Sequence, residues 1–424
     1  MSEGIIKSAR LVDNSIVDIR VTNGKISELS NKISGEVLYD AQQNLILPGL
    51  VDLHTHLREP GREDSETVLT GSTAAVRGGY TAISPMANTL PVADTAGVVE
   101  QVFSLGIEAA LCDVFPIGAV TQGLAGKQLS EIVAMNNSKA NVKIFSDDGK
   151  CVSDPLLMRR ALEYVKTFDG IIAQHAQDPR LTENAQMNEG VVSARLGLSG
   201  WPAVAEEAII ARDILLAEHV GSRLHICHLT TAGGVELVRF AKSRGVRVSA
   251  EVTPHHLLLT EDLIHGYDPI YKVNPPLRTE MDVLALRQGL ADGTIDIVAT
   301  DHAPHPAEDK DCEWQAAAFG MLGLETALSV VIKAMSDFNN FSWKEVSEVM
   351  SINPARIAGY TNHGQEIKPG SAANLAIIDT SNYWRVDRNR LASKSKNTPF
   401  DQMELPPVIK ATIFNGTLVY GGAN

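Results

Sequence analysis

Histidines and aspartates that could bind metal ions recur in the middle of the chain, each close behind a short apolar run. The clearest pair is His54 and His56, which stand two residues apart in the stretch Asp52-Leu53-His54-Thr55-His56. Side chains two apart in a β-strand point to the same side, so both imidazoles could bind one cation. Taken alone, such a pair is more often two ordinary polar residues near the end of a strand.

Four further potential ligands follow other apolar runs: Asp148, His175, His228 and Asp301. So many buried imidazoles and carboxylates need a compensating cation. Neutral nitrogen and carboxylate oxygen suit zinc best, with manganese or cobalt as alternatives. Six ligands exceed the need of one tetrahedral ion, so we predict two Zn²⁺ per chain that share a bridging carboxylate and a hydroxide. The chemistry of such a pair is metal-assisted hydrolysis, most simply of an amide.

The apolar runs that precede these residues are the expected strands of a parallel barrel. They are apolar on both faces, as parallel strands buried under helices are. They alternate with amphipathic stretches, and no G-x-G-x-x-G follows the first, so a (β/α)8 TIM barrel fits better than a dinucleotide-binding sheet. In such a barrel the carboxyl ends of the strands, and with them the candidate ligands, meet at one face. The expected strands are 45–53, 80–85, 108–116, 141–145, 171–174, 223–227, 246–253 and 295–300, and the clearest helices are 154–167, 202–219, 232–244 and 280–291.

Both ends of the chain have a different pattern, that of β-hairpins. Residues 16–21 and 25–27 flank Asn23-Gly24, and residues 411–414 precede Asn415-Gly416. Asn-Gly between β-prone runs predicts a tight hairpin turn. We therefore expect a small β-sandwich domain built from both termini. Its N-terminal part would be 1–46, the catalytic barrel 47–362 and its C-terminal part 363–424.

The composition excludes several classes of function. Among 424 residues, 37 Lys+Arg against 51 Asp+Glu give a formal net charge of −14, which argues against nucleic acid as a partner. No apolar run approaches the roughly 20 residues needed to cross a bilayer, and residues 1–10 lack the pattern of a secretory signal. The four cysteines lie far apart and predict neither a disulfide framework nor a zinc knuckle. We expect a cytoplasmic protein that acts on a small molecule, with no membrane partner.

Two motifs resemble the signatures of dihydroorotase in the amidohydrolase superfamily. They are His54-Thr55-His56-Leu57-Arg58-Glu59-Pro60-Gly61 and Ala299-Thr300-Asp301-His302-Ala303-Pro304-His305. Matches at 86–89, 145–149, 274–278 and 319–320 extend the resemblance over nearly the whole chain. Asp147-Asp148-Gly149 resembles the long bacterial type. Ala87 stands where the family usually has proline, a departure expected to change local stiffness rather than chemistry.

The resemblance implies a reaction and a role for each ligand. One zinc would be held by His54 and His56, the other by His175 and His228, and Asp148 would bridge both. The implied reaction is the reversible, zinc-dependent hydrolysis of the cyclic amide of (S)-dihydroorotate to N-carbamoyl-L-aspartate. This is the third step of de novo pyrimidine (UMP) biosynthesis.

The same resemblance assigns the proton transfer and the substrate contacts. Asp301 would bind metal and act as the catalytic residue, taking the proton of the hydroxide and giving it to the departing amide nitrogen. Arg58 would recognise the substrate carboxylate, because a guanidinium can bind it with two parallel hydrogen bonds. Its ordinary alternative is a surface salt bridge to Glu59 or Asp64. The other expected substrate contacts are His56, Asn88 and His305 on the carboxylate side and Asn274, Phe319 and Gly320 at the ring amides.

Two structural questions stay open from the sequence alone. Lys143, within the fourth expected strand, could be carboxylated and bridge the metals in place of Asp148. Asp147 and Asp148 are adjacent, so in an extended chain only one of them can face the metals, and the resemblance selects Asp148. Residues 306–316 follow the eighth strand and are either a solvated loop or a mobile lid.

Competing functions come from the same superfamily or from a different class. Another cyclic amidase, such as a dihydropyrimidinase, hydantoinase or allantoinase, would not need the carboxylate pocket of Arg58. A catalytically silent homologue could instead scaffold aspartate transcarbamoylase, but such a protein should have lost metal ligands and this chain keeps all six. We expect a homodimer, and association with aspartate transcarbamoylase stays open.

Overall fold

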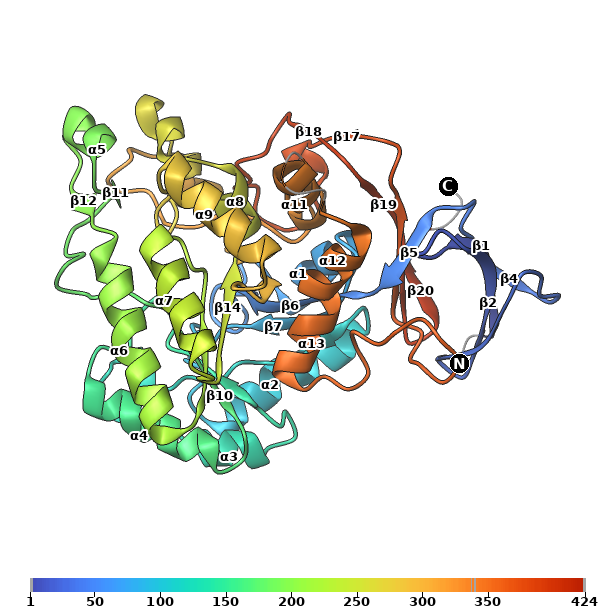
Figure 1. Cartoon of the computed structure of the whole chain (residues 1–424), viewed down its shortest axis with the longest axis horizontal. Helices are drawn as coiled ribbons and strands as arrows, with labels where there is room; N and C mark the ends of the chain where they lie inside the picture. The colour runs from blue at the N-terminus through green and yellow to red at the C-terminus, as the bar shows by residue number, and fades with distance from the viewer. Residues whose placement is uncertain (1–2, 337, 339–340, 422–424) are drawn as a thin grey trace.

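A helix-covered barrel and a curled β-sheet make up the chain in a computed structural model, which describes residues 3–336, 338 and 341–421. The sheet is built from strands of the N-terminal and C-terminal segments and lies at one side of the barrel (Figure 1). None of the described helices is long and apolar enough to cross a membrane. The expected candidate ligands all lie in the barrel.

Eight parallel strands form the barrel in chain order. Parallel pairing joins β6-β7-β8 and β9-β10-β13-β14-β15. Parallel bridges between Gly118 and Phe145 and between Thr55 and His302 connect these two runs into a closed ring. The predicted TIM barrel is therefore confirmed. Its strands are β6 (Leu50–Thr55), β7 (Tyr80–Pro85), β8 (Asp113–Val114), β9 (Ile144–Phe145), β10 (Ile171–Gln174), β13 (Arg223–Ile226), β14 (Val248–Val252) and β15 (Ile297–Val298).

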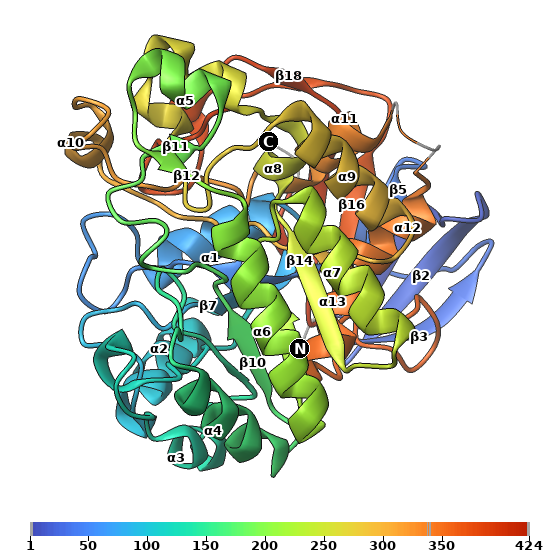
Figure 2. The same cartoon turned by 60° about the vertical axis from the view of Figure 1, so that its left-hand side comes forward.

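Helices cover the outside of this ring, and Figure 2 shows α6, α7 and α9 side by side there. The four helices expected from the sequence correspond to α4, α6, α7 and α9. The helices between and after the strands are α1 (Val68–Arg77), α2 (Ala96–Ala109), α3 (Ile132–Asn137), α4 (Pro155–Lys166), α6 (Val204–Val220), α7 (Ala232–Ser243), α9 (Glu280–Ala291), α11 (Ala327–Ser336), α12 (Trp343–Ser347) and α13 (Asn353–Ala358), with a π-helical turn at Glu348–Ile352.

Shorter elements decorate the loops that connect these parts. They are α5 (Val191–Leu196), α8 (Pro254–Leu258), α10 (Ala307–Lys310), the strand pairs β11 (Met187–Asn188) with β12 (Gly200–Trp201) and β17 (Trp384–Arg385) with β18 (Glu404–Leu405), and short 3₁₀ helices at Gln122–Leu124, Glu261–Gly266, Pro269–Tyr271 and Arg388–Arg390.

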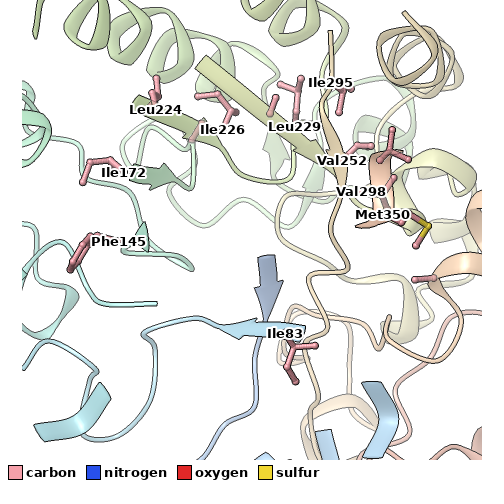
Figure 3. Packing of buried hydrophobic residues seen from close by; sticks show 14 of the residues in the cluster. Ile83, Phe145, Ile172, Leu224, Ile226, Leu229, Val252, Ile295, Val298 and Met350 are labelled. Atoms are coloured by element: carbon pink, nitrogen blue, oxygen red, sulfur yellow. The ribbon is translucent and has the colours of Figure 1, made fainter. Parts of the chain in front are cut away.

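The main core lies between the barrel strands and the helices around them (Figure 3). Full burial of one such aliphatic side chain stabilises the fold by about 1.5–3 kcal/mol. The strands are thereby fixed in position, and so are the residues that follow them. The side chains that Figure 3 labels are each at most 1% exposed: Ile83, Phe145, Ile172, Leu224, Ile226, Leu229, Val252, Ile295, Val298 and Met350.

Side-chain caps fix where three of the outer helices begin. Asp154 accepts a hydrogen bond from the Leu157 amide at the start of α4, 2.7 Å away. Thr231 caps α7 and Thr279 caps α9 in the same manner. A cap of this kind stabilises a helix by about 1 kcal/mol. Because each cap directly precedes its helix, it also fixes the end of the loop that runs from the preceding strand.

The terminal sheet curls so that its two halves enclose an apolar interior. The predicted hairpins at Asn23-Gly24 and Asn415-Gly416 both form, and an antiparallel bridge joins Lys25, at the start of β3, to Ala372, three residues before β16. Strands from both termini contribute to the interior. The order is β20-β19-β16-β5-β1-β2-β3, with β4 beside β1, and the strands are β1 (Gly4–Arg10), β2 (Ile16–Thr22), β3 (Lys25–Ser30), β4 (Val37–Asp40), β5 (Leu45–Pro48), β16 (Leu375–Asp379), β19 (Val408–Phe414) and β20 (Thr417–Tyr420).

Two of the expected strands differ from the observed ones. The run 45–53 divides at Gly49 into β5, which pairs with β16 in the terminal sheet, and β6, the first barrel strand. A Cβ atom on Gly49 would lie 2.3 Å from the Thr81 side chain, so only glycine permits this passage. The strand predicted at 108–116 was wrong in its first half. There α2 continues through Ala109 and is capped at Ala110, where φ is 53°. Alanine favours a helix more than a strand.

The segment between β16 and β19 leaves the sheet and crosses the carboxyl end of the barrel. The Asn397 amide donates to the Ala303 carbonyl at 2.9 Å, and the Lys394 backbone N–H donates to Glu66 at 3.0 Å. Part of the C-terminal region therefore packs beside the candidate ligands. The domain boundaries at 46 and 363 stay predictions.

Candidate active site

Six candidate ligands converge at the carboxyl ends of five barrel strands. His54 lies in β6 and His56 directly after it, while His175 directly follows β10. The other three stand two or three residues beyond the strand that carries them: Asp148 after β9, His228 after β13 and Asp301 after β15. Each of the six is at most 4% exposed.

Asp148 lies at the centre of this cluster. Its carboxylate oxygens are 3.4 Å from the Nε2 atoms of His54 and His56. They are 3.2 Å from Nδ1 of His175 and 3.1 Å from Nε2 of His228. Two groups of three possible ligands therefore share Asp148.

Asp301 lies against the first of these groups. Its Oδ1 atom is 2.9 Å from Nε2 of His56 and 3.5 Å from Nε2 of His54. Asp301 thus touches one histidine pair, while Asp148 touches both pairs.

The donor set fits metal cations. Nε2 of His54 is buried and has no hydrogen-bond partner among the described residues. Nδ1 of His175 faces Nε2 of His228 at 2.8 Å, so two ring nitrogens point at the same space. Burying polar nitrogens in this way is costly unless a proton or a cation lies between them. Imidazole nitrogens around a carboxylate are the ligands that zinc takes in proteins.

Electrostatics within the cluster act in the same direction. Burial opposes charge on Asp148, but His54 and hydrogen bonds from His175 and His228 hold the pKa of the carboxyl well below its ordinary value. Burial likewise disfavours a charged His54, yet Asp148, Glu251 and Asp301 raise the pKa of its imidazole well above the ordinary value. The site therefore carries concentrated negative charge that a cation can balance.

Glu251 was missed in the sequence analysis although it supports the cluster directly. It lies on β14, and its Oε1 atom is 2.5 Å from Nδ1 of His54. Its Oε2 atom is 2.9 Å from Nε2 of His225, and Oε1 accepts the His228 backbone N–H at 3.2 Å. A carboxylate on the far nitrogen of a ligating histidine fixes its tautomer and orientation. The available signal was a glutamate between Ala250 and Val252, near the carboxyl end of the seventh expected strand.

Asp52 is a second carboxylate that the sequence analysis did not assign. One of its oxygens accepts the backbone N–H groups of His54 at 3.0 Å and Thr300 at 3.1 Å. Burial raises the pKa of this carboxyl to about 7. Asp52 thereby ties the first strand of the barrel to the segment that carries Asp301.

The two alternatives to Asp148 both point away from the cluster. Asp147 accepts backbone N–H groups from Val120 at 2.8 Å and Thr121 at 2.9 Å, in a neighbouring loop. The Lys143 ammonium lies 5.8 Å from the centre of the Phe168 ring. Of the three residues, only Asp148 touches the histidines.

Arg58 lies beside the histidine cluster, and its guanidinium has no carboxylate partner among the described residues. Its Nε atom donates to the Pro304 carbonyl at 3.1 Å, and a terminal nitrogen lies 3.4 Å from Nε2 of His305. Burial lowers the pKa of this guanidinium to about 10. The alternative salt bridges to Glu59 or Asp64 do not form. Arg58 is therefore a desolvated cation that could accept an anionic ligand.

The other expected substrate contacts surround the same space. Asn88 Oδ1 lies 2.9 Å from Nδ1 of His56, and the Phe319 carbonyl lies 2.8 Å from Nε2 of His305. Gly320 has a φ of 148°, and a Cβ atom there would come within 2.7 Å of the His305 ring.

On the opposite side, the Asn274 amide donates to Gln177 at 3.4 Å, and Gln177 lies 2.7 Å from Nε2 of His175. Oδ1 of Asn274 has no partner in the described part of the chain, which leaves a buried acceptor available to a ligand.

Comparisons with known proteins agree with this arrangement. The model of a family described as Dihydro-orotase-like matches residues 43–233. The chain is 61% identical to a dihydroorotase of Streptomyces coelicolor, with 99% of each chain covered, and 60% identical to one of Leifsonia xyli, with 97% of this chain and 94% of the relative covered. It is 52% identical to the dihydroorotase of Mycobacterium tuberculosis over 94% of both chains.

Solved structures with the same fold include an L-hydantoinase (dihydropyrimidinase) from Arthrobacter aurescens. The TM-score is 0.89 at 26% identity, with 100% of this chain and 97% of that chain covered. A dihydropyrimidinase from Brevibacillus agri superposes with a TM-score of 0.84 at 18% identity, which shows the fold alone.

Proposed function

The chain belongs to the dihydroorotase family, and we propose that it binds two zinc ions at the six-residue cluster to interconvert (S)-dihydroorotate and N-carbamoyl-L-aspartate. It is a metal-dependent hydrolase and a dihydroorotase of pyrimidine biosynthesis. The observation that carries the substrate assignment is the unpaired guanidinium of Arg58 beside the cluster. A carboxylate on the substrate would supply the missing partner.

The two groups that share Asp148 support a site for two metals. His54 and His56 would hold one ion, His175 and His228 the other, and Asp148 would belong to both. When bound, such ions lower the pKa of a water molecule and polarise a carbonyl group. Glu251 would keep His54 in the tautomer that presents Nε2 to the metal.

Asp301 is the proposed proton carrier of the reaction. In ring opening, the oxygen of a water molecule forms a bond to the amide carbon and the ring C–N bond breaks. Asp301 takes the proton that the water loses and transfers it to the departing ring nitrogen. Ring closure reverses each of these steps. Its contact with only one histidine pair supports this role, since Oδ1 is 2.9 Å from Nε2 of His56.

Binding and orientation of the substrate fall to the residues around the cluster. Arg58, Asn88 and His305 would hold the carboxylate. Asn274 and the backbone of Phe319 and Gly320 would meet the ring amides. The unpartnered Oδ1 atom of Asn274 is suited to accept an N–H group from the ring.

The competing functions explain less of the site. The fold is also that of an L-hydantoinase, but a hydantoin or dihydrouracil ring without a carboxylate would leave the partly buried guanidinium of Arg58 without a carboxylate partner. A catalytically silent scaffold would not need a cluster of six buried side chains that can bind metal.

Association with other chains remains part of the proposal. Helices α6, α7 and α9 pack side by side, and each exposes a large apolar side chain: Leu215 is 64% exposed, Phe240 60% and Met281 79%. We propose that the chain forms a homodimer and that aspartate transcarbamoylase is a candidate partner. Size-exclusion chromatography with light scattering, of the chain alone and with that enzyme, measures both.

One assay tests the proposed function. The purified protein is analysed for metal by mass spectrometry and assayed with dihydroorotate, dihydrouracil, hydantoin and allantoin. We expect two zinc ions per chain and turnover of dihydroorotate far above that of the other three rings. Faster turnover of a ring without a carboxylate would assign the chain to another cyclic amidase. A metal-free chain that is inactive even after zinc is added would favour the scaffold.

A further inference from the structure

Two buried lysines near the active site have no carboxylate partner in the described part of the chain. Lys272 is 2% exposed and Lys310 is 8% exposed. A buried ammonium is costly unless its N–H groups are satisfied. In both residues the N–H groups are satisfied by main-chain carbonyls of residues 314–320 and of Lys272 itself.

Both lysines donate hydrogen bonds to carbonyls of the segment between β15 and α11. The Lys272 ammonium donates to the carbonyls of Trp314 at 2.6 Å and Gln315 at 3.2 Å. It also lies 4.5 Å from the centre of the Phe319 ring, a distance suited to a cation–π interaction.

Lys310 lies within this segment, at the end of α10, and binds both the segment and Lys272. Its ammonium donates to the carbonyls of Lys272 at 3.1 Å, Ala318 at 2.9 Å and Gly320 at 3.2 Å. Three N–H groups thus meet three acceptors. The backbone N–H of Gly320 donates to the Lys272 carbonyl at 3.0 Å, which adds a backbone hydrogen bond between the segment around Lys272 and the segment around Gly320.

Two of the carbonyls that Lys310 holds, those of Ala318 and Gly320, lie on either side of Phe319, one of the proposed substrate contacts. Gly320 packs against the His305 ring, and the preceding residue, Phe319, places its carbonyl 2.8 Å from Nε2 of His305. Asn397 accepts the His305 backbone N–H at 3.1 Å and donates to the Gly320 carbonyl at 3.2 Å. Displacing the Gly320 carbonyl would therefore move both the backbone at 319–320 and His305.

We propose that Lys310, braced by Lys272, is a positioning residue that holds the Phe319–Gly320 backbone and His305 in the orientation that binds the substrate. This proposal rests on the proposed function, because it uses the substrate contacts assigned there. It predicts an effect on substrate binding without an effect on the metal ligands, none of which either lysine touches. A hydrophobic residue could fill the same volume but could not satisfy three carbonyls.

The test compares Lys310→Met with Lys394→Met. Lys310 and Lys394 both line a cavity of about 680 Å³ beside His305. The Lys394 ammonium, however, donates to the Glu63 carbonyl and not to residues 318–320. Leaving buried carbonyls unsatisfied should raise KM for dihydroorotate by about 10- to 100-fold in Lys310→Met. The kcat should change much less, and metal content should equal that of the wild type. Lys394→Met should keep the wild-type KM, and Lys310→Arg, which restores N–H donors, should recover part of the loss.

The outcomes separate this proposal from the proposed function. A wild-type protein that does not turn over dihydroorotate contradicts the function, whatever the variants do. An active wild type with an unchanged KM in Lys310→Met contradicts the positioning role, as does a loss confined to kcat or to metal content. All assays are run well below the unfolding temperature of each variant. If Lys310→Met does not fold, Lys272→Met and Lys310→Gln take its place, and a wild-type KM in both contradicts the proposal.

Discussion

The interior of the terminal sheet and the carboxyl face of the barrel both bury polar groups, but they differ in whether those groups have hydrogen-bond partners. In the sheet the interior is apolar, and the buried Asp18 accepts backbone N–H groups from Ser8 and Ile33, both at 2.9 Å. At the barrel face, histidines and carboxylates crowd together, and Nε2 of His54 and Oδ1 of Asn274 have no partner among the described residues. Satisfied polar groups stabilise a fold, whereas an unsatisfied buried polar atom needs an explanation, and beside the candidate ligands a metal ion or the substrate supplies one.

This contrast suggests that the two regions answer differently to substitution. Removing a polar group from the barrel face should reduce activity more than stability, since the group's partner is a metal ion or the substrate. Removing one from the terminal sheet should reduce stability and leave activity unchanged. The predictions below test that difference, beginning with the largest expected effect.

The largest effect is expected from Asp148→Ala. Without the shared carboxylate, two cations would repel each other at close range, so the variant should lose at least one zinc ion. Because a bound metal contributes several kcal/mol to catalysis, activity should fall by about three orders of magnitude. Metal stoichiometry by mass spectrometry and the rate with dihydroorotate measure the two losses.

Lys143→Ala is the matched control for Asp148→Ala. Lys143 precedes the same barrel strand, but its ammonium lies over the Phe168 ring, so its loss should spare both metals. Activity should also not respond to added bicarbonate, because no lysine carbamate is required. If Lys143→Ala lost metal while Asp148→Ala kept two ions, the bridge would be a carboxylated lysine.

The second effect concerns Asp301, the proposed proton carrier. Asp301→Asn conserves the shape of the side chain but removes the base, so kcat should fall by at least about 100-fold. The zinc ion proposed at His175 and His228 should remain, because Asp301 lies against the other histidine pair, 2.9 Å from His56 and 3.5 Å from His54. Steady-state kinetics with metal analysis tests this. A nearly normal kcat would move the base elsewhere, with His305 as the next candidate.

The third effect concerns specificity. Arg58→Met keeps most of the bulk but removes the guanidinium, and loss of one charge-assisted contact costs about 1.5–3 kcal/mol. That corresponds to a fall of roughly 10- to 150-fold in kcat/KM for dihydroorotate. Metal content should not change, since Arg58 is not in contact with the two groups of ligands. Turnover at the wild-type level would contradict the carboxylate pocket.

Much of the fold was predictable because its signals are local. The barrel follows from eight runs of consecutive apolar residues, a pattern typical of strands that are buried on both faces. The hairpins follow from two Asn-Gly pairs. The error at residues 45–53 arose because one continuous apolar run supplies strands to two different sheets. Residues 45–53 look like a single strand, and only the approach of Thr81 to Gly49 shows that two different sheets share them.

The convergence of the candidate ligands was predictable from the sequence, but the residues that support them were not. His54 and Asp148 carry donor atoms at strand ends, a pattern visible without tertiary structure. Glu251 is 197 residues away from His54 and hydrogen-bonds to it only in the closed barrel. Lys310 likewise looks like a solvated residue of a charged loop, yet it is buried by backbone that only the folded chain brings together. Motifs record donor atoms, whereas hydrogen-bond partners depend on the fold.

The smallest effect should come from the terminal sheet. Asp379, at the end of β16, is 8% exposed. It accepts the backbone N–H groups of Ser381 at 3.0 Å and Asn382 at 3.2 Å, and both side chains also donate to it at 2.7 Å. Burial opposes charge on this carboxyl, but these bonds lower its pKa to about 2. Asp379→Asn should therefore cost about 1–2 kcal/mol of stability at neutral pH.

The pH dependence of that cost has a definite sign. The folded pKa of Asp379 lies below the ordinary unfolded value of about 3.9, so its stabilisation is fully present above that value and is lost as pH falls toward about 2. The difference in Tm between wild type and Asp379→Asn should thus be constant from neutral pH down to about 5 and shrink below about 4. Asp40→Asn, at an exposed position that accepts one N–H group from Gln42, is the control and should change stability by less than about 0.5 kcal/mol. Both variants should turn over dihydroorotate at the wild-type rate. If Asp379→Asn instead lowered kcat/KM at neutral pH with no change in Tm, the terminal sheet would take part in the reaction, and its contrast with the barrel face would not hold.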